Sequence, residues 1–197
     1  MKAIIFLAVI FSITSLNSCK DKDPKVTKTL ELSEEMKAYF VDYEVGTKWI
    51  YQDTVNPNVY DTIELVSKDS YDVDKGNGTL RKGFELLYKP KKSKDFIVRV
   101  GAGNNNSCNA KLDPMVTAAG AVVFENYNGV WAEGLVYYDS LNITGSWFYS
   151  VIHSSGSNMY VTDVSISKNK GIIGFWRYKN DSWALENYFK LIKILKP

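Results

Sequence analysis

Histidine and cysteine are scarce in this chain, whose 197 residues include one histidine and two cysteines. Because structural zinc and iron sites draw most of their ligands from these residues, we expect no multi-ligand metal site and no cofactor. Neither sign of charge predominates: 24 basic and 22 acidic residues leave a net charge of +2. A concentrated basic surface is typical of nucleic-acid binding, so we expect no nucleic-acid partner.

The longest apolar run stands at the start of the chain and is itself short. Met1 and Lys2 precede nine apolar residues, 3–11, which are followed by small polar residues up to Ser18. A bilayer-spanning helix needs about 20 apolar residues, so this run is too short to be one. A basic start, a short apolar stretch and small residues are typical of a secretory signal, which we predict over residues 1–18.

This segment ends with Leu16-Asn17-Ser18-Cys19, which resembles the lipobox of bacterial lipoproteins. The resemblance implies acyl chains on Cys19 and a membrane as the partner of that lipid anchor. Each buried methylene contributes about 0.8 kcal/mol, so two or three chains would hold the protein durably. We therefore expect a signal peptide over 1–18, a lipidated flexible tether over 19–32 and a single β-rich domain over 33–197.

Charged residues follow the lipobox cysteine directly, in the order Lys20-Asp21-Lys22-Asp23. A lysine followed by acidic residues resembles the surface-export signal of Bacteroidota lipoproteins, although Lys22 here separates the two acids. The expected location is therefore the cell envelope, with the chain lipid-anchored to the outer membrane. Both orientations stay open, periplasmic and surface-facing.

The remainder of the chain predicts an all-β fold with one short N-terminal helix. Ser33 is a suitable N-cap for a helix over 34–40, and two acids in its first turn favour the positive end of the helix dipole. Strand-like runs separated by Gly, Asn and Asp indicate an antiparallel meander that forms a barrel, a half-barrel or a sandwich. Residues 102–115 are expected to form the longest break. The predicted strands are 47–54, 58–68, 79–89, 95–101, 116–125, 130–139, 145–153, 158–168, 171–178 and 182–195.

Two segments resemble small Bacteroidota lipoproteins of unknown function. Residues 40–51 contain an aromatic residue followed by Gly46, Trp49 and Tyr51 in a G-x-x-W-x-Y pattern, which is similar to the first strand of those proteins. Residues 171–176, followed by 183–185, resemble their closing hairpin. The resemblance implies a location class, an outer-membrane or surface lipoprotein, and implies no activity.

Residue patterns that could carry catalysis or metal binding are incomplete, so we expect no catalytic residues and no enzyme. Asp72 and Asp74 begin like a calcium loop, but Gly76 and Gly83 stand where further oxygen ligands are needed. His153 precedes Ser154, yet adjacent residues on a strand point to opposite faces, which is unsuitable for a catalytic pair. Cys108 has no partner for an internal disulfide and is either exposed and reactive or tucked under its loop.

Three tripeptides resemble the O-glycosylation motif of Bacteroidota, in which Asp precedes Ser or Thr and then an aliphatic residue. The resemblance implies Thr54, Thr62 and Ser140 as acceptor residues, while ordinary strand alternation explains the same tripeptides without modification.

Aromatic residues make up 14% of the chain and supply the functional hypothesis. Most of them are expected in the core, because they carry the largest buried area per side chain. The candidates for ligand contact are Trp49, Trp131, Trp147 and Trp176. The leading hypothesis is a binding lipoprotein that holds an apolar or lipid ligand in a curved sheet. The alternative is a surface accessory module that contacts a glycan or another envelope protein, which predicts exposed aromatic residues and no internal cavity.

Overall fold

The protein is described here by a computed structural model. It describes residues 25–74, 77–92, 95–103, 107–113, 122–127, 130–132, 134–154, 164–178 and 185–197. The signal peptide and the lipobox cysteine predicted from the sequence lie outside the described residues. None of the described residues forms a helix with the length and hydropathy that crossing a bilayer requires.

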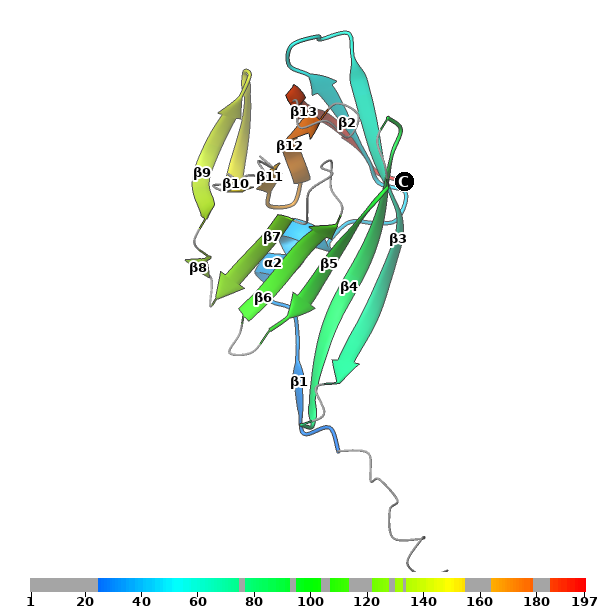
Figure 1. Cartoon of the computed structure of the whole chain (residues 1–197), viewed down its shortest axis with the longest axis vertical. Helices are drawn as coiled ribbons and strands as arrows, with labels where there is room; N and C mark the ends of the chain where they lie inside the picture. Colours follow the sequence, from blue (N-terminus) through cyan, green and yellow to red (C-terminus); the bar gives the residue numbers. More distant parts are fainter. Residues whose placement is uncertain are drawn as a thin grey trace, which may run out of the picture.

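The fold is all-β with a single helix in the described part of the chain, as the sequence predicts. Thirteen strands form one sheet that curves into a nearly closed barrel (Figure 1). The helix is α2 (Glu34–Phe40). The strands are β1 (Lys28–Leu30), β2 (Lys48–Asp53), β3 (Tyr60–Asp74), β4 (Thr79–Pro90), β5 (Phe96–Ala102), β6 (Ser107–Asp113), β7 (Val122–Tyr127), β8 (Val130–Trp131), β9 (Leu135–Ile143), β10 (Ser146–Ser154), β11 (Val164–Ser167), β12 (Gly171–Tyr178) and β13 (Leu185–Leu195).

The strands β2 to β13 follow one another around the barrel as an up-and-down meander. Each pairs with its sequence neighbour in antiparallel fashion, except that β8 and β9 do not pair. The last strand, β13, pairs with β2, with Leu191 opposite Tyr51 and Ile194 opposite Trp49. The circle therefore has one interruption within the described residues, between β8 and β9.

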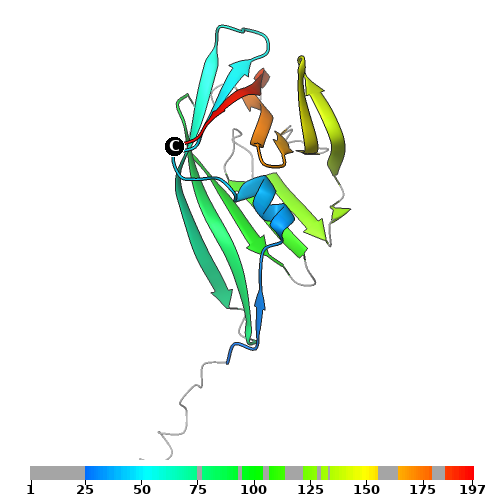
Figure 2. The same cartoon turned by 180° about the vertical axis from the view of Figure 1, so that it is seen from behind.

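The helix α2 begins as the sequence predicts. The Ser33 hydroxyl accepts a hydrogen bond of 3.2 Å from the Met36 backbone N–H, which satisfies one of the free amide groups of the first turn. Met36, Tyr39 and Phe40 are buried, and the helix contacts β5 and β6 on the concave side of the sheet (Figure 2). The helix thus fills part of the barrel interior.

Two segments that the sequence did not predict to be strands join the sheet. Residues 107–113, inside the expected break over 102–115, form strand β6 between β5 and β7. Residues 28–30, inside the segment expected to be tether, form β1 and pair in parallel with the beginning of β4. The inward side chains Cys108, Ala110 and Leu112 are buried, so β6 is a core strand whose polar sequence hides a small apolar face.

Candidate functional site: a filled interior and an exposed aromatic hairpin

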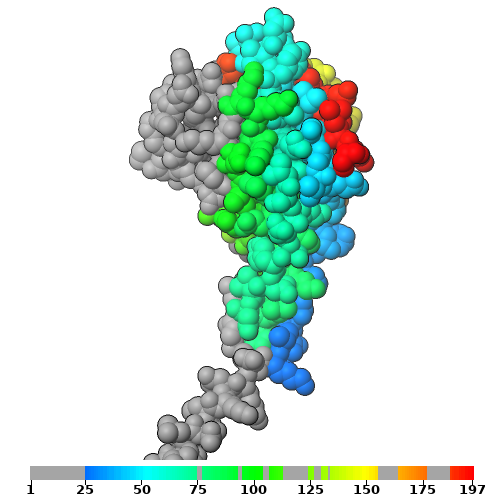
Figure 3. All heavy atoms as spheres, turned by 90° about the vertical axis from the view of Figure 1, so that its right-hand side faces the viewer, coloured from blue at the N-terminus to red at the C-terminus, as the bar shows by residue number. Residues whose placement is uncertain are grey.

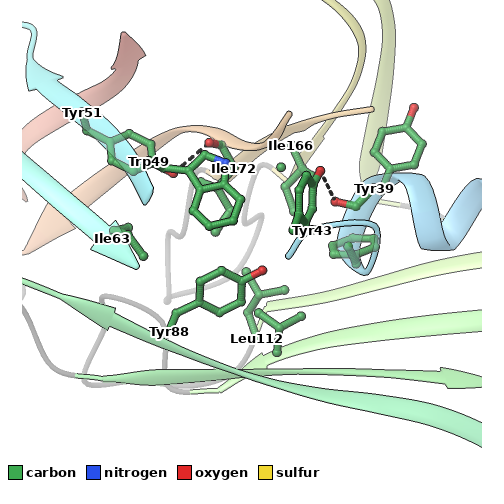
Figure 4. Close-up of a pocket in the computed structure, with 12 residues that line it drawn as sticks. Tyr39, Tyr43, Trp49, Tyr51, Ile63, Tyr88, Leu112, Ile166 and Ile172 are labelled. Atoms are coloured by element: carbon green, nitrogen blue, oxygen red, sulfur yellow. Dashed lines mark hydrogen bonds between the residues drawn. The ribbon is translucent and has the colours of Figure 1, made fainter. Parts of the chain in front are cut away.

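Aromatic side chains pack the interior of the barrel. Trp49, Tyr51 and Tyr88 point into it from β2 and β4, while Tyr43 joins them from the segment after α2 (Figure 4). The Trp49 ring meets Tyr43 edge to face at 5.2 Å between centroids, and Tyr88 stacks on Phe96 at 5.0 Å. Such pairs stabilise a core beyond the area that they bury.

The polar atoms of these aromatic residues are satisfied inside the barrel. Trp49 Nε1 donates to the Lys170 carbonyl at 2.7 Å, and the Tyr51 hydroxyl donates to the Ile172 carbonyl at 2.8 Å. The Tyr43 hydroxyl lies 3.2 Å from the Tyr39 carbonyl, to which it donates. These bonds connect β2 to the β11–β12 turn and to β12, on the other side of the interior, so they hold the two halves of the meander together.

The cavity that these residues line is small. It has a volume of about 20 Å³, which is room for about one water molecule. Pockets for small-molecule ligands measure about 300–1,000 Å³. Burial raises the pKa of Tyr43, Tyr51 and Tyr88 above the ordinary tyrosine value, because a phenolate would be cut off from water there. The part of the interior that these described residues line is therefore a packed core.

In contrast to the buried aromatic residues of the interior, the outer face of hairpin β9–β10 carries exposed ones. Trp147 is 58% exposed and Tyr149 is 64% exposed, and both lie on the same side of β10. On the neighbouring β9, Asn142 lies opposite Trp147 and Ser140 lies opposite Tyr149. Further along β9, Tyr138 is 36% exposed, lies opposite the buried Val151 and meets the His153 ring at 6.4 Å between centroids. We call these three rings, Tyr138, Trp147 and Tyr149, the aromatic face.

The hairpin is held firmly enough to present this face. Its two-residue turn has Thr144 and Gly145 at φ values of 43° and 85°, the left-handed pair that tight hairpins favour. Phe148 and Ile143, on the opposite side, are buried in the core. Lys190 Nζ donates to the Thr144 carbonyl at 2.8 Å and ties the hairpin tip to β13. A preorganised surface loses less entropy on binding than a flexible one.

The four tryptophans proposed as ligand contacts lie in different environments. Trp49 is 2% exposed and belongs to the core. Trp131 packs edge to face on Tyr39 at 5.4 Å, and Trp176 packs in the same way on Tyr188 at 5.4 Å. Only Trp147 among the four stands out on an exposed face. Tyr138 and Tyr149 are not among the ligand contacts proposed from the sequence. Trp147 and Tyr149 are two residues apart in a predicted strand, a spacing that indicates a shared face.

The three glycosylation motifs also differ in their surroundings. Asp53 is buried, and its Oδ1 accepts hydrogen bonds from the Val55 and Asn56 backbone N–H groups. Asp61 is buried as well, and its Oδ1 accepts from the Thr62 backbone N–H at 2.7 Å. These two carboxylates have structural roles in the backbone around Thr54 and Thr62. Asp139 and Ser140 are instead exposed on β9, so Ser140 is the most accessible of the three acceptors.

His153, considered in the sequence beside Ser154, has its hydrogen-bond partner on the neighbouring strand instead. His153 Nδ1 and Ser165 Oγ share a hydrogen bond of 2.9 Å across β10 and β11, a contact that the sequence did not indicate. Ser165 is only 1% exposed, so a substrate cannot reach its hydroxyl and the bond serves to join the strands. Among the described residues, no group of three or more His, Cys, Asp or Glu side chains could hold a metal ion.

Cys108 lies in the interior face of β6 and is buried. Its Sγ is 3.8 Å from the Ser33 hydroxyl, to which it donates. Of the two states expected from the sequence, exposed or tucked away, the structure has the second.

Comparison of the chain with protein-family models, curated proteins and solved structures gives no match.

Proposed function

We propose that this chain is a recognition module of the bacterial cell envelope, which binds a partner macromolecule through the aromatic face of hairpin β9–β10. The observation that carries the proposal is the contrast between an interior that the described residues fill and three exposed rings on one hairpin. Fully exposed large aromatic side chains are costly in solubility, and clusters of them mark interaction sites. This is the alternative hypothesis from the sequence, a surface module that contacts a glycan or another envelope protein.

The composition of the hairpin supports recognition of a macromolecule. Residues 135–154 contain three Tyr, one Trp and four Ser, and their only acid or base besides His153 is Asp139. Interface centres are depleted in charge and enriched in Tyr and Trp. Tyr and Ser are also the residues that antibodies use most at their binding loops, because they combine rigid contact area with adaptable hydrogen bonding.

The position of the hairpin in the molecule agrees with this role. The chain enters the fold at β1, at one end of the longest axis, whereas the tip of β9–β10 points away from that end (Figure 1). Figure 3 shows the outer side of β3 and β4, with β1 at one end and the β2–β3 hairpin at the other. If Cys19 is lipidated, as we propose, the tip of the β9–β10 hairpin is directed away from the membrane.

We place the protein on the outer membrane as a Bacteroidota-type lipoprotein, held by acyl chains on Cys19. This proposal is supported by the lipobox and by the charged residues that follow it. It leaves both orientations open, toward the periplasm or toward the outside. Of the three proposed sugar acceptors, Ser140 is the exposed one, while the other two motifs contain buried carboxylates. Ser140 lies opposite Tyr149, so a sugar on it and a partner on the aromatic face would exclude each other.

A carrier of an apolar ligand such as a lipid is the second candidate, favoured by the aromatic lining of the interior. Because the cavity has room for about one water molecule, loading an acyl chain would require α2 to leave the concave side of the sheet. Native mass spectrometry of the 25–197 chain separates the two candidates. A reproducible extra mass that denaturation removes would favour the carrier, and the bare polypeptide mass would favour the recognition module.

Site-specific photo-crosslinking tests the aromatic face directly. A photoreactive phenylalanine analogue replaces Trp147 in one variant and Val55 in a matched control, because Val55 is 74% exposed but lies on the β2–β3 hairpin. Both variants are incubated with the envelope fraction of the bacterium that makes the protein. We expect a discrete crosslinked product from position 147 only. Equal crosslinking at both positions, or none at position 147, would contradict the proposal.

A further inference from the structure

Strand β9 is an edge strand of unusual length. It has nine residues, and within the described part of the chain its only ladder partner is β10. The preceding strand, β8, has two residues and pairs with β7 instead. Between them, the Leu135 backbone N–H donates to the Ala132 carbonyl at 3.2 Å, after which β9 runs on without a second neighbour. An edge of this kind is a template for another strand.

The turn geometry shows which backbone groups of β9 face this edge. The two-residue turn Thr144-Gly145 makes Ile143 and Ser146 the first hydrogen-bonded pair of the hairpin. Hydrogen-bonded and non-hydrogen-bonded pairs then alternate along an antiparallel ladder. Between the turn and Ser150, whose φ of 49° interrupts the ladder opposite Asp139, the backbone N–H and C=O groups of Ser140 and Asn142 therefore point away from β10. Their side chains lie on the side of the sheet that carries the aromatic face.

The usual protections of an edge strand are missing from β9. Natural edges are blunted by lysine, by proline or by being very short. The sequence of β9, LVYYDSLNI, contains no proline and no basic residue, and its one charge is Asp139. The opposite end of the sheet, β8, is protected by its length of two residues. Among the described residues, one long edge is thus left without a second strand, and it is the edge beside the aromatic face.

We propose that β9 binds an extended segment of a partner protein as an added strand, which continues the sheet beyond β9. The inference rests on the proposed function and specifies its partner as a polypeptide. A peptide backbone offers N–H and C=O groups at the strand spacing that the outward groups of β9 require, which a glycan does not. Alternate side chains of the segment would pack beside Tyr138, next to Trp147 and Tyr149.

Charge complementarity further specifies this segment. Asp139 stands at the centre of β9 and is exposed, so a Lys or Arg directly opposite it is favoured. Full antiparallel pairing of two copies of β9 would instead place Asp139 against Asp139, and like charges directly opposite each other destabilise a strand pair. A second copy is therefore disfavoured as the occupant, and we infer a different protein with a basic residue in an otherwise uncharged strand.

Three synthetic peptides of nine residues test the inference on the 25–197 chain. The first alternates Thr and Val around a central Lys. The second has Glu at the centre. The third keeps the Lys but is N-methylated at its four valines, which are the residues that would face the outward groups of β9. Binding is measured by fluorescence anisotropy, and hydrogen exchange is followed at the outward amides of residues 140 and 142.

Two variants of the chain accompany these peptides. Ser140→Pro removes one outward N–H without touching the β10 ladder, and edge positions tolerate proline. Ser140→Ala is its matched control, since both variants lack the hydroxyl and only the proline lacks the N–H. We expect the Lys peptide to bind and to protect the outward amides in the parent and in Ser140→Ala. Binding should be lost with Ser140→Pro and with the N-methylated peptide, and weaker by about threefold with the Glu peptide.

Other results would overturn the inference. Equal binding of the N-methylated peptide would show that side chains alone make the contact, and absence of binding by the Lys peptide would show that β9 does not accept a strand. A dimer of the parent chain that Ser140→Pro dissociates in sedimentation would identify a second copy as the occupant. If the peptides fail while position 147 still crosslinks to an envelope component, strand addition is wrong and the recognition module stands. If position 147 also fails, both are wrong.

Discussion

At the scale of single residues, the close fit between neighbouring strands is clearest at Gly83. This glycine on β4 lies opposite Tyr71 on β3, and the Tyr71 ring lies over the space where a larger residue at position 83 would place its Cβ. The Tyr71 hydroxyl reaches the Val100 carbonyl at 3.4 Å on the next strand. Tyr71 on β3 therefore contacts β4 at Gly83 and β5 at Val100, and so links these three strands.

Gly83→Ala is therefore expected to destabilise the protein. A methyl group at position 83 would overlap the Tyr71 ring, and overpacking of this kind costs about 1–3 kcal/mol of the free energy of unfolding. Chemical denaturation of the purified 25–197 chain measures the change. The same substitution made in a Tyr71→Ala background should cost much less, because the ring is no longer there. Equal costs in both backgrounds would mean that the glycine matters for its backbone and not for the ring.

At the scale of elements, the helix was predicted from local signals and the strand β6 was not. Ser33 and two following acids define the start of α2, and the N-cap bond exists as expected. The polar sequence of residues 107–113 predicts a loop, whereas its buried face consists of the small or modest side chains Cys108, Ala110 and Leu112. Because β5 and β7 supply both ladders of β6, pairing with neighbours overrides its weak local preference.

The candidate site was only partly predictable for the same reason. Trp147 was expected to contact a ligand, and it is exposed beside Tyr138 and Tyr149. Trp49, expected in the same role, is in the core, because closure of the barrel by the β13–β2 pair turns it inward. This pairing joins residues about 140 positions apart, and no local pattern in the sequence determines it. The face that each aromatic residue occupies depends on that closure.

The N-cap of α2 allows a prediction at this scale. Ser33→Ala should lower the free energy of unfolding by about 1 kcal/mol, because the Met36 backbone N–H loses its acceptor. Ser33→Asp is the matched control, since a carboxylate can accept the same bond. The second measurement is labelling of Cys108, whose buried thiol lies 3.8 Å from the Ser33 hydroxyl. We expect faster labelling by a maleimide in Ser33→Ala. Unchanged stability in that variant would show that α2 does not depend on its cap.

At the scale of the whole molecule, buried tyrosines make stability depend on alkaline pH. Burial raises the pKa of Tyr39, Tyr43, Tyr51 and Tyr88 above the ordinary value of 10.0. Above pH 10 the unfolded chain loses these protons while the folded chain keeps them, so the unfolded state binds fewer protons and the free energy of unfolding falls as pH rises. Each such tyrosine can contribute a slope of up to about 1.4 kcal/mol per pH unit.

We therefore expect these tyrosines to cause no change in the free energy of unfolding below about pH 9. Above pH 10 they should make it fall steeply as pH rises. Urea titrations at a series of pH values measure it. Tyr43→Phe is a useful comparison, because it removes one of the four titrating groups and the bond to the Tyr39 carbonyl. Its stability at pH 7 should be lower by about 1 kcal/mol, while its loss above pH 10 should be shallower. A parallel pH profile would mean that Tyr43 does not contribute to the alkaline transition.

The two ends of the molecule have separate tasks in the proposed function, and the two cysteines of the chain separate them experimentally. Cys19 precedes the point where the chain joins the fold at β1, whereas Cys108 is buried in β6. If Cys19 carries the lipid, Cys19→Ala should move the protein from the membrane to the soluble fraction of the producing bacterium, because the acyl chains are lost. Cys108→Ala is the matched control and should stay with the membrane, since it removes the other thiol without touching the anchor.

Fractionation and immunoblotting measure both variants, and the released Cys19→Ala protein should still crosslink from position 147, because the aromatic face lies at the other end. Membrane association that persists in Cys19→Ala would rule out the lipid anchor and leave the aromatic face as the means by which the protein is held at the envelope.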